Sequence, residues 1–194
     1  ASCLDDCQTL LLQTTLWKSL NECLRTIQIE QIVCYGIGNF SKTSRTYYSA
    51  SLWQLALAIS MLTHFDAHIS FYDPCLTTNE EQFLLVDLGC HVMNTNDRGK
   101  HRAAALFFMP HCPRQLYENV VRSNWENDNF MILGNDLREM KGSCIQLLRP
   151  YLQCSKLVDD KGNDNMPAGN WIGGLNDTYI SSFQLQKGEW PEKP

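Results

Sequence analysis

Glycines and polar side chains follow several apolar segments of this chain, and their types could bind a ligand or do chemistry. Gly36 and Gly38 come directly after the apolar run 32–35. Glycines after a strand let backbone N–H groups approach a phosphate, and the N-terminus of a following helix favours an anion. The polar residues that follow and could contact such an anion are Asn39, Ser41, Lys42, Thr43, Ser44 and Arg45.

The two glycines do not make a complete dinucleotide fingerprint. Ser41 stands where the third glycine of Gly-x-Gly-x-x-Gly belongs. Asp73 ends the next apolar segment, where a Rossmann carboxylate would hold ribose hydroxyls. It follows Gly38 by 35 residues, whereas the usual separation is about 20. Anion binding, a plain turn at the glycines and an Asp-Pro turn at residue 73 all stay open.

A third group, His111-Cys112-Pro113, follows the apolar run 104–109. A thiolate in a Cys-Pro dipeptide can ligate ferric heme, so Cys112 is a candidate heme ligand. Adjacent residues rarely face each other as a nucleophile and its base must, which argues against a Cys–His catalytic pair. The alternative is a histidine that caps the strand end and bonds to a neighbouring loop. Asp73 and His111 remain the one candidate acid–base pair, and this scarcity favours binding over catalysis.

The remaining candidates are polar or basic loop residues. The loop 96–102 (NDRGKHR) is basic and could meet a phosphate or an acidic partner, or it could be a solvated turn. Asn124 and Asn135 carry amides that suit the pinning of loops, and the neighbouring Trp125 suits packing better than stacking on a ligand. Asp177, with Thr178 after it, either completes the wall of a crevice or caps a turn.

Composition excludes several classes of protein. The 194 residues suit one domain, and 44% hydrophobic with 19% charged residues is typical of a globular protein. A net charge of -5 argues against a general nucleic-acid binder. Nine cysteines without a CxxC pair indicate free thiols in a reducing compartment. We therefore predict a cytoplasmic protein, with the nucleus as a second compartment, and no membrane span, because no apolar run reaches about 20 residues.

Hydrophobic periodicity predicts the elements that position these residues. Apolar residues at steps of three and four predict one amphipathic helix over 4–27. Thr78 and Glu81 fit a capping box for a helix that runs to Leu88. The other predicted helices are 47–64, 114–123 and 136–149, and the predicted strands are 32–35, 68–72, 90–93, 104–109, 130–133 and 179–185.

Apolar strands separated by helices predict a mostly parallel sheet covered on both faces. The expected fold is a Rossmann-like three-layer α/β domain at 32–186, preceded by the N-terminal helix and followed by a frayed tail at 187–194. Ligands in such sheets bind beyond the carboxyl ends of the strands. The strand ends expected to line one crevice are 36–40, 72–73, 110–112 and 134–135.

Eight fragments occur in an order that resembles the Sensitivity to Red light Reduced family of eukaryotic proteins, over roughly residues 32–183. They are CYGIGNF, YDP, LG, GK, FFMPHC, LYENVVRSNW, ILGN and NDTYISSF. The chain departs from the family pattern at two places. The last motif more often has a histidine where this chain has Ser181, and the loop 159–174 is longer or different.

The resemblance implies a regulatory role, because no enzymatic activity is firmly established for the family. Plant members are implicated in light signalling and the circadian clock, and animal and yeast members in control of heme biosynthesis. The leading hypothesis is thus a regulatory protein with protein partners, whose crevice binds a small anionic or heme-like ligand. The alternative is a Rossmann-type enzyme or nucleotide-binding protein that uses an adenosine-containing cofactor.

Overall fold

The apolar segments of the sequence form the middle of one seven-stranded sheet. A computed structural model describes residues 3–25, 27–41, 49–100, 104–127, 129–157, 174–175, 177–185 and 189–194. The strands are β1 (Gln31–Tyr35), β2 (His68–Tyr72), β3 (His91–Val92), β4 (Ala105–Met109), β5 (Phe130–Gly134), β6 (Leu152–Lys156) and β7 (Tyr179–Phe183). Their order is β3-β2-β1-β4-β5-β7-β6, and β7 runs antiparallel to both of its neighbours.

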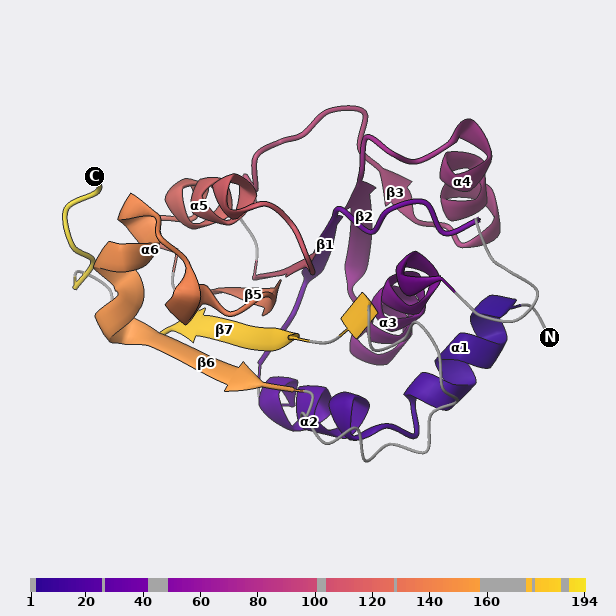
Figure 1. Ribbon diagram of the computed structural model, residues 1–194, viewed down its shortest axis with the longest axis horizontal. Helices are drawn as coiled ribbons and strands as arrows, with labels where there is room; N and C mark the ends of the chain where they lie inside the picture. Colours follow the sequence, from indigo (N-terminus) through magenta and orange to yellow (C-terminus); the bar gives the residue numbers. More distant parts are fainter. Residues whose placement is uncertain are drawn as a thin grey trace.

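Helices cover both faces of this sheet, as Figure 1 shows. The helices are α1 (Cys3–Leu11), α2 (Thr15–Leu24), α3 (Ala50–Phe65), α4 (Thr78–Gln82), α5 (Arg114–Ser123) and α6 (Ser143–Leu148). A π-helical turn, η1 (Phe83–Asp87), continues α4, and the 3₁₀ turns η2 (Leu137–Glu139) and η3 (Arg149–Tyr151) flank α6. The predicted three-layer α/β fold with a mostly parallel sheet is therefore confirmed.

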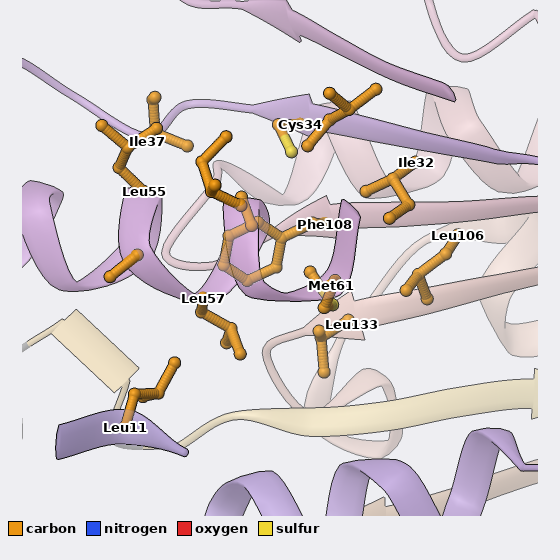
Figure 2. Close-up of a cluster of buried hydrophobic side chains, with 14 of the residues drawn as sticks. Leu11, Ile32, Cys34, Ile37, Leu55, Leu57, Met61, Leu106, Phe108 and Leu133 are labelled. Carbon is orange, nitrogen blue, oxygen red and sulfur yellow. The ribbon is translucent and has the colours of Figure 1, made fainter. Parts of the chain in front are cut away.

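Side chains of β1 alternate between two cores, because successive residues of a strand point to opposite faces. Ile32 and Cys34 join the core beneath α1, α2 and α3, whereas Val33 and Tyr35 join the core beneath α5 and α6. Figure 2 shows Ile32 and Cys34 in the first core together with Met61 of α3. Burial on both faces explains why this strand reads as a continuous apolar run.

The single helix predicted over 4–27 is wrong, because the segment forms α1 and α2. Thr14 has an extended backbone (φ −77°, ψ 160°), and its hydroxyl accepts a hydrogen bond from Trp17 N. The same hydroxyl donates to Leu11 O at 2.6 Å. A threonine in this geometry is an N-cap, so it ends the first helix and starts the second.

Two other helix predictions need correction. The sequence TTNEE allows two capping boxes, and the structure forms the one between Thr77 and Glu80, one residue before the predicted pair. Residues 136–149 do not form one helix, because Gly142 is extended (φ −135°, ψ 148°) and α6 begins only after it. The strand β6 lies in a segment for which periodicity predicted no element.

The tail is also ordered differently from the prediction, since its described part, 189–194, packs on α5 instead of fraying. Trp125 Nε1 donates to Pro191 O at 3.0 Å, and the Trp125 and Trp190 rings lie 5.7 Å apart. Arg122 Nη1 also donates to Pro194 O at 2.9 Å. Aromatic packing and these two hydrogen bonds hold the segment against the domain.

Candidate functional site

The candidate site lies where the strand order changes direction. β1 pairs in parallel with β2 on one side and β4 on the other, and β4 pairs in parallel with β5. The carboxyl ends of these four strands therefore share one edge, which we call the carboxyl edge. In open α/β sheets the switch point, here between β1 and β4, is where ligands bind.

The two glycines after β1 have backbone conformations that favour glycine. Gly36 and Gly38 have φ values of +67° and +72°. A Cβ atom on Gly36 would lie 2.7 Å from Cys112 Sγ, and one on Gly38 would lie 2.6 Å from Ser51 Oγ. The glycines thus let the end of β1 approach the loop after β4 and the start of α3.

Asp73 lies next to these glycines despite its distance in sequence. Its Oδ2 accepts a hydrogen bond from Gly38 N at 2.6 Å, and its Oδ1 accepts one from Cys75 N at 2.7 Å. The separation of 35 residues in sequence therefore does not keep Asp73 from contacting Gly38. In this structure the carboxylate joins the ends of the two strands.

Cys112 is buried at the switch point. Its Sγ donates to Tyr35 O at 3.3 Å. Burial, with a smaller contribution from the Asp73 charge, raises the pKa of the Cys112 thiol to about 12. Heme ligation by this thiol stays a prediction, and it would require the side chain to leave Tyr35 and lose its proton.

His111 follows β4 with a left-handed backbone (φ +54°) and an exposed side chain. Its backbone N–H donates to Asn135 Oδ1 at 2.7 Å, and Asn135 N donates to the Tyr117 hydroxyl at 2.8 Å. That hydroxyl donates to Met109 O. Asn135 thus pins the loop after β4, as the sequence indicated, and the imidazole is left at the surface.

The basic loop after β3 is fixed to the end of β1. The Tyr35 hydroxyl donates to Asp97 Oδ1, and Gly99 N donates to the same hydroxyl at 2.9 Å. Asn124 Nδ2 then donates to Gly99 O at 2.7 Å. Burial and the hydrogen bond to Asp97 raise the pKa of Tyr35, so the phenol keeps its proton.

Two cations of this loop are available to a ligand. Arg98 and Lys100 are exposed on either side of Gly99. Neither side chain forms an ion pair within the described part of the chain. The structure therefore places two exposed cations on either side of Gly99, whose backbone is hydrogen-bonded to the hydroxyl of Tyr35 at the end of β1.

The other predicted site residues lie elsewhere or outside the described residues. Asp177 precedes β7, three strands from β1, which corresponds to about 14 Å across the sheet. Its nearest cation is Lys156, with Nζ 3.9 Å from Oδ1. Asn39 accepts a hydrogen bond from Ser41 Oγ at 3.1 Å. Lys42 and Arg45 fall in the part of the chain that the structure does not describe.

Sequence reasoning missed Tyr35, Asp97 and Tyr117 as parts of this edge. The Tyr35 hydroxyl joins β1 to Asp97 and Gly99, more than 60 residues away, and the Tyr117 hydroxyl joins α5 to Met109 and Asn135 at the ends of β4 and β5. The sequence did contain a signal, which is the tyrosine hydroxyl. A tyrosine at the end of a buried strand, such as Tyr35, or in the first turn of a helix, such as Tyr117, needs a hydrogen-bond partner for its hydroxyl when it is buried. The identity of that partner depends on strand pairing and not on local sequence.

No described helix is long and apolar enough to cross a membrane. Among the described residues, no three histidine, cysteine or acidic side chains gather as metal ligands would.

The strand order and the edge define this chain as a Rossmann-like α/β domain with a candidate ligand site at its switch point. The sequence model of the SRR1 domain matches residues 13–183, so the chain belongs to the SRR1 domain family. This confirms the resemblance drawn from the eight fragments.

Relatives are known from a plant and from animals. Protein SENSITIVITY TO RED LIGHT REDUCED 1 of Arabidopsis thaliana is 38% identical over 105 residues, which is 52% of this chain and 36% of that protein. The SRR1-like protein of Mus musculus is 32% identical over 115 residues, which is 56% of this chain and 45% of that protein. The matched segment therefore spans less than half the length of these relatives.

Two solved structures are similar in overall arrangement. A crystal structure of MtNAS in complex with MTA and tNA has a TM-score of 0.49 at 14% identity and covers 88% of this chain and 59% of its own. A crystal structure of the 23S rRNA methyltransferase ErmE has a TM-score of 0.48 at 13% identity and covers 89% and 68%. At these values neither structure bears on the activity of this chain.

Proposed function

We propose that this chain is a regulatory domain that binds a small anionic ligand at the carboxyl edge between β1 and β4. The observation that supports the proposal is the basic loop after β3, in which Asp97 and Gly99, the neighbours of Arg98, are hydrogen-bonded to the Tyr35 hydroxyl at the end of β1. Gly36 is exposed at the same edge, but its N–H already donates to Tyr72 O at 3.2 Å. Two exposed cations on a loop held by hydrogen bonds suit a phosphate or carboxylate.

The regulatory part of the proposal draws on the family. A plant relative is named for a reduced sensitivity to red light, and the family resemblance implies clock and heme-biosynthesis control. Most polar groups at the edge are engaged in hydrogen bonds between loops, as Asp73 and Asn135 illustrate. Such a site suits a bound ligand that adjusts loop positions and hence the binding of protein partners.

Inorganic phosphate is the first probe for this site. We expect it to raise the melting temperature of the chain saturably, with weaker binding in Arg98→Ala and Lys100→Ala. Lys18→Ala, on the exposed surface of α2, serves as the matched control because it removes an equal charge elsewhere. Equal losses in all three variants would reduce the effect to general charge screening and overturn the proposal.

A nucleoside-containing ligand is the second candidate, favoured by the 2.6 Å contact between Asp73 and Gly38 N. A carboxylate at the end of β2 beside the first glycine loop is where ribose hydroxyls are held. S-adenosylmethionine, NAD and ATP should then stabilise the chain more than phosphate does, and Asp73→Asn should remove that excess. Recovery of the nucleoside unchanged after incubation would distinguish binding from catalysis.

Heme is tested separately because its chemistry differs. Hemin should give a Soret band that changes in Cys112→Ala if the thiol becomes a ligand. An unchanged band would remove Cys112 from the site, in keeping with its burial against Tyr35.

A further inference from the structure

An apolar pocket borders the loop that follows β1. It is an open pocket with a volume of about 290 Å³, lined by the start of α1, the start of α3, the α4–η1 segment and the loop itself. The pocket borders Phe40 and Ser41 of this loop and does not include Gly36 or Gly38, which belong to the proposed anion site. We call it the α1–α4 pocket.

The walls of the α1–α4 pocket are apolar. Leu4, Phe40, Leu52 and Phe83 line it, one from each of the four segments. The Phe40 and Phe83 rings lie 6.1 Å apart at 52° to each other. Tilted rings at this separation can offer both faces and edges to another ring.

The carboxylate in the wall is already fully used by the protein. Glu80 Oε1 accepts from Ser41 N at 2.7 Å, and Oε2 accepts from Thr77 N and from Thr77 Oγ1, both at 2.9 Å. Burial would raise the pKa of Glu80, but these hydrogen bonds outweigh it and lower the pKa. The pocket therefore has a fixed negative charge in its wall.

Among the residues that the structure describes, no lysine or arginine lines the pocket to offset that charge. An anionic ligand would meet a buried carboxylate without a counterion, which is unfavourable. The two remaining lining residues, Cys3 and Asn79, are exposed and stand at its mouth. Charge and shape together select against anions and in favour of a neutral ring.

We propose that the α1–α4 pocket binds a small uncharged aromatic molecule, with its ring between Leu4, Leu52 and the two phenylalanines. The volume is at the small end of ligand pockets, so a molecule of one or two rings fits its size. The site does not depend on the anion site, although both border the loop after β1. Apolar burial supplies the affinity, and Glu80 supplies the discrimination by charge.

Indole and indole-3-carboxylate make a matched pair of probes, because they share a bicyclic ring and differ by one negative charge. We expect indole to raise the melting temperature saturably and the carboxylate to bind at least about tenfold more weakly. In ¹H–¹⁵N spectra indole should shift the amides of Ser41 and Asn79 and leave that of His111 in place. Equal binding of both probes, or no saturable effect of indole, would overturn the proposal.

A blocking variant locates the site without disturbing the core. Cys3→Trp places a large ring at the mouth from an exposed position, and we expect it to abolish the indole effect. Thr9→Trp is the control, because Thr9 is exposed on the same helix and does not line the pocket. If indole stabilises both variants equally, it binds somewhere else and the assignment fails.

Discussion

Gly36 and Cys112 fix the end of β1 against the loop after β4, at the switch point of the sheet. The thiol donates to Tyr35 O, and a Cβ atom on Gly36 would lie 2.7 Å from the sulfur. The contact needs a glycine for two independent reasons, which are the positive φ of +67° and the lack of space. A single methyl group at this position should therefore be costly.

We predict that Gly36→Ala lowers the free energy of unfolding by about 2–4 kcal/mol, from the left-handed backbone and from overpacking. Urea denaturation followed by circular dichroism measures the loss. In a Cys112→Ala background the steric part disappears, so the cost of the glycine substitution should fall to about 1–2 kcal/mol. Equal costs in both backgrounds would mean that the sulfur does not limit the space.

At the level of single residues, the sequence predicted which residues lie at the carboxyl edge better than it predicted what each of them contacts. Gly36, Gly38, Asp73 and His111 were found because each follows an apolar strand, and parallel pairing brings such ends to one edge. The environment of Cys112 was not foreseen, because its thiol bonds to the carbonyl of Tyr35, 77 residues away in the chain. Residue type and local order carry no information about such a neighbour.

Helix α6 illustrates how a distant side chain can start an element. Its N-cap position, Gly142, has no side chain, and the carboxylate of Glu118 on α5 takes its place. Glu118 accepts from Cys144 N at 2.7 Å, Ser143 Oγ at 2.9 Å and Ile145 N at 3.3 Å. The predicted helix 136–149 failed at this point, because periodicity does not reveal a cap donated by another helix.

We predict that Glu118→Gln lowers the free energy of unfolding at pH 7 by about 1.5–3 kcal/mol, because a charged acceptor of three hydrogen bonds is lost. Burial raises the pKa of Glu118, but the hydrogen bonds outweigh it and lower the pKa below its ordinary value of 4.5. The contribution is therefore present above pH 4.5 and is lost as the pH falls through the lower folded-state pKa.

Urea titrations of wild type and Glu118→Gln between pH 7 and acid conditions test this sign. The two stabilities should converge as the pH drops. Glu139→Gln is the control, because Glu139 is exposed on η2 and its substitution should change little at any pH. A difference that widens in acid would contradict the assigned role of Glu118.

The docked tail is a second element whose behaviour depends on tertiary contacts. Polar and proline-rich ends of chains usually fray, which is why the sequence favoured that outcome. We predict that Trp190→Ala lowers the free energy of unfolding by about 1–2 kcal/mol, through loss of its contact with Trp125. Glu192 is exposed in the same segment, so Glu192→Ala should have almost no effect. Urea unfolding measures both variants, and equal losses of stability would show that Trp190 does not hold the tail.

For the whole molecule, the sequence predicted the layers but not the order of the strands. Continuous apolar runs at β4 and β5 indicated burial on both faces, and all five residues of each strand are buried. The order β3-β2-β1-β4-β5-β7-β6 arises from pairings between distant segments, and β7 even inserts between β5 and β6. The local hydrophobic pattern shows which faces of a strand are buried, whereas the identity of the neighbouring strands depends on the assembled sheet.

This arrangement predicts how resistance to opening is distributed through the domain. β4 is hydrogen-bonded on both sides and buried on both faces, whereas β6 pairs only with β7 within the described sheet and is largely exposed. Amides at the centre of a sheet exchange only in large openings, and edge amides exchange in small ones. In native-state hydrogen exchange we expect the slowest amides in β1, β4 and β5 and much faster ones in β3 and β6. Protection of β6 equal to that of β4 would mean that another chain or another segment of this chain covers the β6 edge. Dilution of the sample would then distinguish the two, because only the contact with a second copy is lost on dilution.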